Sequence, residues 1–143
     1  MKSNATTTWT GDLASGSGTA SLATGVATAL PVTWASRTEA ADGKTSPEEL
    51  IAAAHSACYS MALSAGLAGA GHAPEKLVTE AEVTFDQKDG NWTVISSHLH
   101  VTATVPGIDS DAFAEQAQHA KDGCPVSRAL AGNVEITLEA ELS

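Results

Sequence analysis

The stretch Ser46–Leu63, SPEELIAAAHSACYSMAL, is a long helical pattern that decides the fold. Ser46 is a typical N-cap, Pro47 fits the first helical position, and Glu49 stands where its side chain completes a capping box. We expect the helix to continue to about Ala70. Its side chains are small or apolar on all sides, which is typical of a central, buried helix.

The segment before this helix has the pattern of β-structure. The runs 6–12 and 19–25 flank a turn rich in glycine and serine, which predicts a hairpin. A third extended run, 26–34, contains Pro31 and therefore suits a sheet edge. Arg37 follows this run, just before a polar loop that leads into the helix.

The segment after the helix predicts a second hairpin, formed by residues 77–86 and 92–105. A second helix at residues 110–121, a further helical turn at 124–130 and a last strand at 134–142 follow it. Alternate residues from Leu99 to Val105 are apolar, which marks one buried face. The element order is therefore β-β-β-α-β-β-α-β. Strands broken by helices in this way predict an α+β fold with antiparallel sheets and a long central helix, in a single domain over residues 1–143.

Composition excludes several classes of partner. The chain has 143 residues, with 17 acidic against 7 basic side chains and a net charge of −10. This charge argues against nucleic acid or an anionic membrane surface as a partner. We expect no membrane span and no secretion signal, hence a cytoplasmic protein. In such a chain, two cysteines indicate redox chemistry, metal binding or buried thiols rather than a disulfide framework.

The two cysteines differ in their predicted surroundings. Cys58 lies in mid-helix among alanines, so burial should raise its pKa unless a cation approaches. A lone buried cysteine is most often a small hydrophobe. Cys124 precedes Pro125 at a predicted helix N-terminus, which stabilises a thiolate. Local physics therefore favours Cys124 as the nucleophile, and the alternative is that Cys124 is only an N-cap residue.

A buried thiolate needs a cation, and the chain has two arginines, Arg37 and Arg128. We expect Arg128 to face solvent. Glu48 shares a helix face with Cys58, whereas Glu49 lies on the opposite side. Ten residues along a helix span about 15 Å, so Glu48 cannot contact the cysteine of its own helix. It acts elsewhere or reaches the Cys58 of a second subunit, which would place the site at an interface.

Histidines offer a competing interpretation. His55 lies one turn before Cys58, and His98 and His100 share one strand face, so these side chains have the chemistry of metal ligands. Their spacing matches no metal motif, and no phosphate-binding loop is present. We therefore expect His55 in a core or interface, a half-solvated histidine pair, and no metal or cofactor. The alternatives left open are a non-catalytic Cys/His redox sensor or metal-binding module, and a structural protein with inert cysteines.

These motifs together resemble a known family. The stretch Ser46–Leu63 closely resembles the helix of the OsmC/Ohr superfamily, the osmotically inducible protein C and organic hydroperoxide resistance proteins. Residues 120–127, AKDGCPVS, look like its second cysteine motif. Residues 9–12, 18–19 and 105–109 are also similar to OsmC, so the resemblance covers essentially the whole chain.

The resemblance implies roles for four residues. Cys58 corresponds to the peroxidatic cysteine and Cys124 to the resolving cysteine. The family's acidic residue is the first glutamate after the proline, which is Glu48. Arg37 matches the segment that supplies the activating arginine in the OsmC branch. The Ohr branch takes its arginine nearer the N-terminus, where this chain has none, so the OsmC branch is favoured.

The resemblance also implies an activity. It predicts a cysteine-based, peroxiredoxin-like enzyme that reduces organic hydroperoxides, and hydrogen peroxide more weakly, to alcohols in oxidative and osmotic stress defence. The route would be a sulfenic acid on Cys58 and an intrachain disulfide with Cys124, restored by an external dithiol of the dihydrolipoamide type. The family further implies an intertwined homodimer with two sites at the interface.

Overall fold

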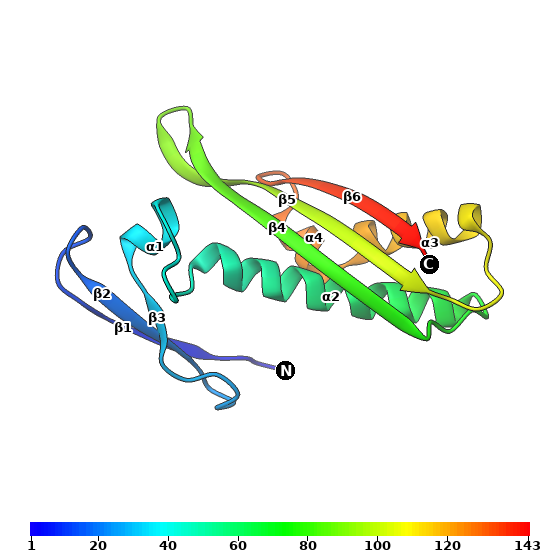
Figure 1. Ribbon diagram of the computed structural model, residues 1–143, viewed down its shortest axis with the longest axis horizontal. Coiled ribbons are helices and arrows are strands. Elements are labelled where there is room, and N and C mark those ends of the chain that lie inside the picture. Colours follow the sequence, from blue (N-terminus) through cyan, green and yellow to red (C-terminus); the bar gives the residue numbers. More distant parts are fainter. The chain divides into compact units, whose positions relative to one another are not determined.

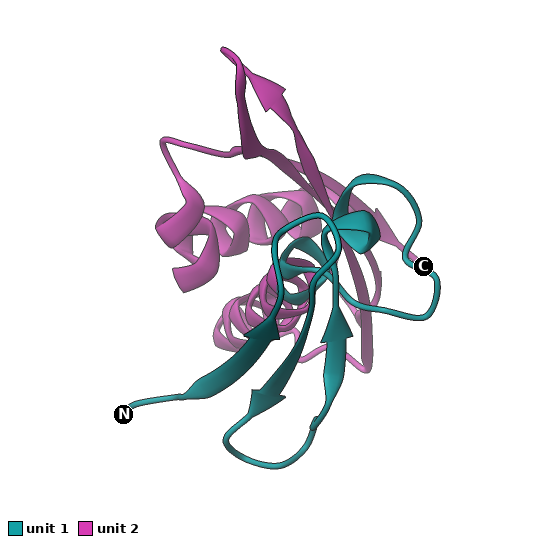
Figure 2. Ribbon diagram, turned by 90° about the vertical axis from the view of Figure 1, so that its left-hand side faces the viewer, with its two compact units in different colours: residues 1–50 teal, residues 51–143 magenta.

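Two three-stranded sheets and a long helix make up the fold (Figure 1). The computed structural model describes residues 1–143. They divide into two compact units, residues 1–50 and residues 51–143, which are coloured separately in Figure 2. The long helix begins in the first unit and continues into the second.

The first unit contains an antiparallel sheet of β1 (Ala5–Thr10), β2 (Ser17–Leu22) and β3 (Leu30–Val32), in that order. The predicted hairpin is confirmed. Pro31 lies on the edge strand β3 opposite Thr19, also as expected. The third strand is much shorter than residues 26–34, because a helix begins two residues after it ends.

That helix, α1 (Trp34–Thr38), is absent from the sequence prediction. The Thr33 side chain accepts the backbone N–H of Ser36, and the Ser36 side chain accepts the backbone N–H of Thr33, which completes a capping box. Five residues are too few to display a helical period, so the capping pair is the only local signal. Arg37 therefore lies on a helix rather than at a strand end.

The long helix is α2 (Pro47–Gly69). The Ser46 hydroxyl accepts the Glu49 N–H at 3.1 Å, which confirms the predicted N-cap. The predicted capping box would also bring the Glu49 carboxylate to the backbone N–H of Ser46. In the structure this carboxylate instead accepts a hydrogen bond from the Thr45 hydroxyl. Gly71, with φ of +88°, stands just beyond the C-terminal end, where a left-handed residue is usual.

Burial of α2 is one-sided, which corrects the prediction of a helix buried all round. His55, Tyr59, Leu63 and Leu67 follow one another at intervals of four residues and have no exposed surface. The opposite side stays open, and Met61 there is 66% exposed. By length and composition α2 is apolar enough to cross a membrane. Its buried stripe packs into the core of residues 51–143, so it is a core helix, in agreement with the sequence expectation of no membrane span.

The second unit contains β4 (Lys76–Lys88), β5 (Asn91–Thr104) and β6 (Glu135–Leu142), with β5 in the centre. The predicted β4–β5 hairpin is confirmed. Its turn residues Asp89 and Gly90 both have positive φ, at 53° and 79°, as a two-residue hairpin turn of type I′ requires.

One strand direction was predicted wrongly, because β6 pairs with β5 in parallel. Between these strands the chain passes through α3 (Ser110–Gly123) and α4 (Pro125–Leu130), which confirm the predicted helix and helical turn. These helices return the chain to the end where β5 began, and a crossover of this kind yields a parallel neighbour. In Figure 1, α3 and α4 lie along one face of the sheet.

The core of this unit joins α2, β5 and α3. Leu99, Val101 and Ala103 are fully buried, as their alternation predicted. Phe113 and Ala117 of α3 complete the core. The hydroxyl of the buried Tyr59 donates to a backbone carbonyl of α3, which satisfies the one polar group of that side chain.

Candidate active site

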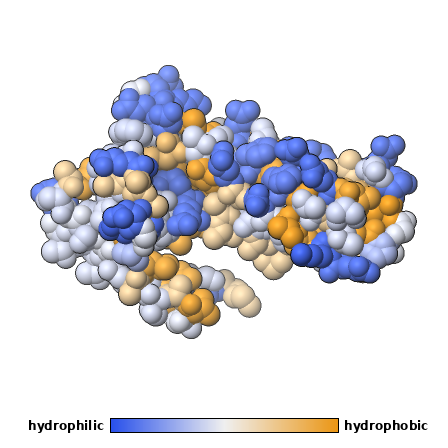
Figure 3. Space-filling model, viewed as in Figure 1, coloured by the Kyte–Doolittle hydropathy of each residue, from blue (hydrophilic) through white to orange (hydrophobic).

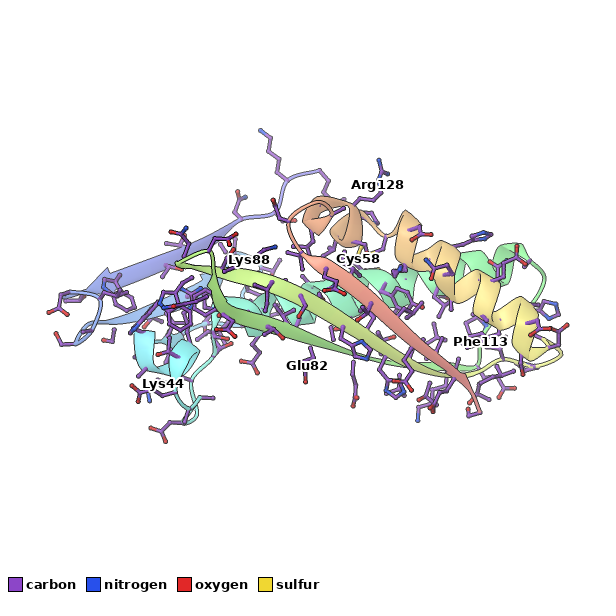
Figure 4. The ribbon with its side chains drawn as sticks, turned by 90° about the horizontal axis from the view of Figure 1, so that it is seen from above. Lys44, Cys58, Glu82, Lys88, Phe113 and Arg128 are labelled. Carbon is purple, nitrogen blue, oxygen red and sulfur yellow. The ribbon has the colours of Figure 1, made fainter.

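Both cysteines lie in the unit of residues 51–143, and both are free thiols. Cys58 is on α2 and is partly buried, whereas Cys124 is the N-cap residue of α4 and has no exposed surface. In Figure 4, Cys58 lies beside α4. The two thiols are close enough for each to shift the pKa of the other. The fold thus brings together the two residues that the sequence singled out.

The two thiols differ in acidity. Burial raises the pKa of Cys58, and its interaction with Cys124 raises that pKa further. Burial also acts to raise the pKa of Cys124, but contacts from the Ser127 amide, the Cys58 thiol and the Ser127 hydroxyl outweigh it and leave the pKa below its usual value. Within this unit Cys124 is the more acidic thiol, as local physics predicted.

His55 is fully buried one turn before Cys58. Its Nδ1 lies 2.7 Å from the Ser97 Oγ, and its Nε2 lies 2.8 Å from the Ser127 Oγ. Burial lowers the pKa of His55, so the ring is neutral at pH 7. Because both ring nitrogens face hydroxyl groups, His55 is a core histidine, one of the two environments expected for it, and has no nitrogen left for a metal.

Sequence reasoning did not single out Ser97 and Ser127. Ser127 stands three residues after Cys124, which is the spacing at which the third helical residue faces back toward the N-cap. That spacing was a usable signal within the stretch Cys-Pro-Val-Ser. Ser97 carries no such signal, since its relation to His55 arises only when β5 packs against α2.

Arg37 and Glu48 form an ion pair within the unit of residues 1–50. Arg37 Nη2 donates to Glu48 Oε1 at 2.6 Å, and Arg37 Nε donates to Oε2 at 3.1 Å. This two-point geometry fixes the guanidinium plane. The guanidinium carbon also lies 5.6 Å from the centroid of the Trp34 ring. Glu48 is only 6% exposed, which distinguishes it from its exposed neighbour Glu49.

The ion pair and the cysteines belong to different units. Along α2 itself, Glu48 and Cys58 are separated by ten residues, or about 15 Å of helix. Glu48 therefore makes no contact with the cysteine of its own helix. The second arginine, Arg128, is exposed and points away from Cys58 in Figure 4, as expected of a solvent-facing charge.

Two hollows lie in the unit of residues 51–143. The first, of about 320 Å³, is next to Ser127 and is lined by α3, α4 and the start of β6. The second, of about 540 Å³, lies along the open side of α2 and includes Met61, Ala65 and Leu77. Figure 3 shows hydrophobic surface interrupting the hydrophilic surface in the region of this unit.

Two further histidines lie on the outer face of the β4–β5–β6 sheet. His98 and His100 point to the same side, as predicted, with Leu99 buried between them. His100 is the centre of a cluster in which possible ligand atoms of His100, Glu139 and Glu141 lie within 4.8 Å of one another. This cluster is the residue set with metal-ligand chemistry, and it is separate from the cysteines.

Comparison with known sequences places these features in a family. The family model described as OsmC-like protein matches residues 40–139. Peroxiredoxin OsmC of Escherichia coli is 44% identical over 134 residues, which cover 94% of this chain and 92% of that protein. The organic hydroperoxide resistance protein of Xanthomonas axonopodis pv. citri is 31% identical over 97 residues, 66% of this chain and 65% of that one.

Solved structures agree on the fold. The organic hydroperoxide resistance protein OhrB of Bacillus subtilis superposes with a TM-score of 0.74 at 24% identity, covering 96% of this chain and 98% of that chain. An organic hydroperoxide resistance protein from Elizabethkingia anophelis gives a TM-score of 0.75 at 25% identity, with coverage of 98% and 96%. The expected α+β fold is confirmed, with one parallel strand pair in a mostly antiparallel architecture. The chain belongs to the OsmC-like family.

Proposed function

We propose that this protein is a thiol-dependent peroxidase that reduces organic hydroperoxides, and hydrogen peroxide more weakly, to alcohols. The observation that carries the proposal is the closeness of two free cysteines, one partly exposed and one buried, which the fold brings together from α2 and the start of α4. Relatives named peroxiredoxin and organic hydroperoxide resistance protein support the same chemistry. The whole chain, residues 1–143, would act as one peroxidase domain in the cytoplasm, in oxidative and osmotic stress defence.

Cys58 is the peroxidatic residue in this proposal. Only Cys58 has exposed surface, so a peroxide can reach its sulfur, whereas Cys124 is fully enclosed. The Cys58 thiolate attacks a peroxide oxygen, the O–O bond breaks, and the alcohol leaves. The product is a sulfenic acid on Cys58. Cys58 therefore reacts first because it is the accessible thiol, even though Cys124 is the more acidic one.

Cys124 is the resolving residue. Its sulfur attacks the sulfenic sulfur of Cys58, water leaves, and an intrachain disulfide forms. An external dithiol then exchanges with the disulfide and returns both thiols. A dihydrolipoamide-type reductant is the expected partner, since it delivers two thiols from one molecule.

The raised pKa of Cys58 requires a nearby cation for activity at neutral pH. We assign this cation to Arg37, which remains charged in any surroundings and is held in a fixed plane by Glu48. An oriented guanidinium would also stabilise the charge that develops on the departing peroxide oxygen. Glu48 thus acts through Arg37 rather than on the sulfur.

The proposed working unit is an intertwined homodimer. Its first support is the separation of about 15 Å between Glu48 and Cys58 on one helix, which calls for a second chain. Its second support is the open apolar side of α2, formed by Ala53, Ala57, Met61, Ala65 and Ala68. A second copy would cover this side and would bring the Arg37–Glu48 pair of one chain to the Cys58 of the other.

The test is turnover of cumene hydroperoxide with a dithiol reductant. Cys58→Ser should abolish peroxide consumption, and Cys124→Ser should give one oxidation that stops at the sulfenic acid. Ser60→Ala is the matched control, because Ser60 lies on the same helix and hydrogen-bonds to Ser56 and Thr79 rather than to a cysteine. Unchanged turnover in Cys58→Ser would refute the assignment. Oxidation of the wild type without turnover would instead indicate a redox sensor.

A further inference from the structure

The reaction above leaves a buried group without a function. His55 has no exposed surface, and its two nitrogens contact Ser97 on β5 and Ser127 on α4. Ser127 stands three residues after Cys124, the N-cap residue of α4, and its amide and hydroxyl lower the pKa of that thiol. Two hydrogen bonds therefore join Ser97, His55 and Ser127, and Ser127 continues this line of polar groups toward Cys124.

The direction of this line follows from the chemistry of a neutral imidazole. Such a ring has one nitrogen that donates and one that accepts. If Nε2 carries the proton, it donates to the Ser127 oxygen, and the Ser127 hydroxyl hydrogen is free to point at the Cys124 sulfur. Nδ1 then accepts from the Ser97 hydroxyl. With the other tautomer, Ser127 would spend its hydrogen on Nε2 and none would reach the sulfur.

We propose that His55 is a positioning residue for the resolving cysteine, which directs the Ser127 hydroxyl hydrogen at Cys124 and so stabilises the thiolate that attacks Cys58. This inference rests on the proposed peroxidase function and adds a residue to its second step. Its carrying observation is geometric: two hydrogen bonds, of 2.7 and 2.8 Å, hold a fully buried ring between two serines of different elements.

The assisted step is balanced without a further reactant. The Cys124 thiolate attacks the sulfur of the Cys58 sulfenic acid, the S–S bond forms, and the S–O bond breaks. The Cys124 sulfur is oxidised and the Cys58 sulfur is reduced, so the oxidant is the hydroperoxide of the preceding step. The departing hydroxide takes up a proton equivalent to the one that the Cys124 thiol released, and water results.

Burial suits this role. Because burial lowers the pKa of His55, the ring stays neutral at the pH at which the enzyme would work, and the line needs no buried cation. The charged side chains that line the hollow beside Ser127 are Lys121, Asp122 and Arg128. Cys58 and Tyr59 are the other titratable groups that interact with Cys124.

The test compares Ser127→Ala with Ser127→Thr. The alanine variant removes only the hydroxyl and leaves His55 in place. The threonine variant keeps the hydroxyl, and its extra methyl group has room because Ser127 borders a hollow of about 320 Å³. Ser60→Ala is again the control, since it removes a hydroxyl of α2 that bonds to Ser56 and Thr79 and to neither cysteine. His55→Gln, which retains a donor and an acceptor, is a fourth variant.

Two steps are followed separately by rapid quenching and mass spectrometry after one equivalent of cumene hydroperoxide. Ser127→Ala should form the Cys58 sulfenic acid at the wild-type rate and close the disulfide at least about tenfold more slowly at neutral pH, because a hydrogen bond to a charged group is lost. Its pH profile for disulfide closure should move to higher pH. Ser127→Thr and Ser60→Ala should behave like the wild type, and His55→Gln should lie between.

Disulfide closure in Ser127→Ala at the wild-type rate would overturn the inference. A wild type that forms no sulfenic acid would instead overturn the peroxidase function, and a second measurement then still decides the role of His55. In a Cys58→Ser background, the thiolate absorbance of Cys124 is titrated with and without Ser127→Ala. The alanine variant should raise the thiol pKa by about one unit, and an unchanged titration contradicts the proposed line.

Discussion

The open side of α2 permits a sharp test of the homodimer with two alanines. Ala65 is exposed on α2, in the stripe that the proposed second chain covers, and Ala114 is exposed on α3, outside the buried set of Phe113, Ala117 and Ala120. We compare Ala65→Asp with Ala114→Asp. Both place the same carboxylate on the surface of a helix in the same unit, so the two variants differ only in what the proposed dimer buries.

The expected free-energy cost of each substitution differs between an isolated chain and a dimer. In an isolated chain each substitution costs about 0.5 kcal/mol of helix propensity, since neither position is in the core. In a dimer, Ala65→Asp would bury an unpaired carboxylate from each chain, at several kcal/mol per ion. A total of about 4 kcal/mol corresponds to roughly a thousandfold weaker association. Ala114→Asp should leave the association constant unchanged.

Sedimentation equilibrium measures the association constant, and urea unfolding measures the free energy of unfolding. Turnover of cumene hydroperoxide measures the activity. We expect Ala65→Asp to be monomeric at micromolar concentration, to unfold cooperatively, and to lose turnover, because the Arg37–Glu48 pair no longer reaches Cys58. A dimeric Ala65→Asp variant, or a monomeric one with full activity, would refute the reasoning about the interface and the site together.

Three further predictions follow from single contacts. Arg37→Ala should slow alkylation of Cys58 by about tenfold or more at neutral pH, because an opposite charge within about 4–6 Å lowers a pKa by about one to three units. Arg128→Ala is the control, and an equal loss in both variants would remove Arg37 from the site. Leu63→Ala should lower the free energy of unfolding by about 2–5 kcal/mol in urea, because Leu63 is fully buried in the core. Finally, burial lowers the pKa of His55, so the unfolded chain binds a proton at this residue more readily than the folded chain does. The contribution of His55 to the free energy of unfolding is therefore complete above the unfolded pKa near 6.5 and declines as the pH falls below that value. The decline between pH 7 and pH 5 should be smaller in His55→Gln, and parallel curves for the two proteins would contradict it.

Much of the fold follows from local patterns. The N-cap at Ser46, the alternation from Leu99 to Val105, and the hairpin turn between residues 86 and 92 each depend on neighbours within a few positions, and the structure confirms all three. The short helix α1 was missed because five residues carry no period, and only the Thr33–Ser36 capping pair marks it. The direction of β6 was missed because alternation is the same in parallel and antiparallel strands.

The burial of α2 shows a different limit of sequence patterns. Small and apolar residues on all sides predicted a central, buried helix, yet Met61 is 66% exposed. Apolar residues on a helix predict that the helix is buried, but they do not indicate whether its own chain or a second copy buries it. The open side is therefore the feature that makes the second subunit a specific, testable proposal.

The sequence by itself determined which residues are candidates for the site: two cysteines in recognisable surroundings, and a glutamate on the same helix face as one of them. Only the tertiary structure decided how they are grouped. It brought Cys124 to Cys58, joined Glu48 to Arg37, and linked His55 to Ser97 and Ser127. The physical reason is that acidity and hydrogen bonding depend on burial and on contacts between elements, which are fixed by packing and not by local spacing.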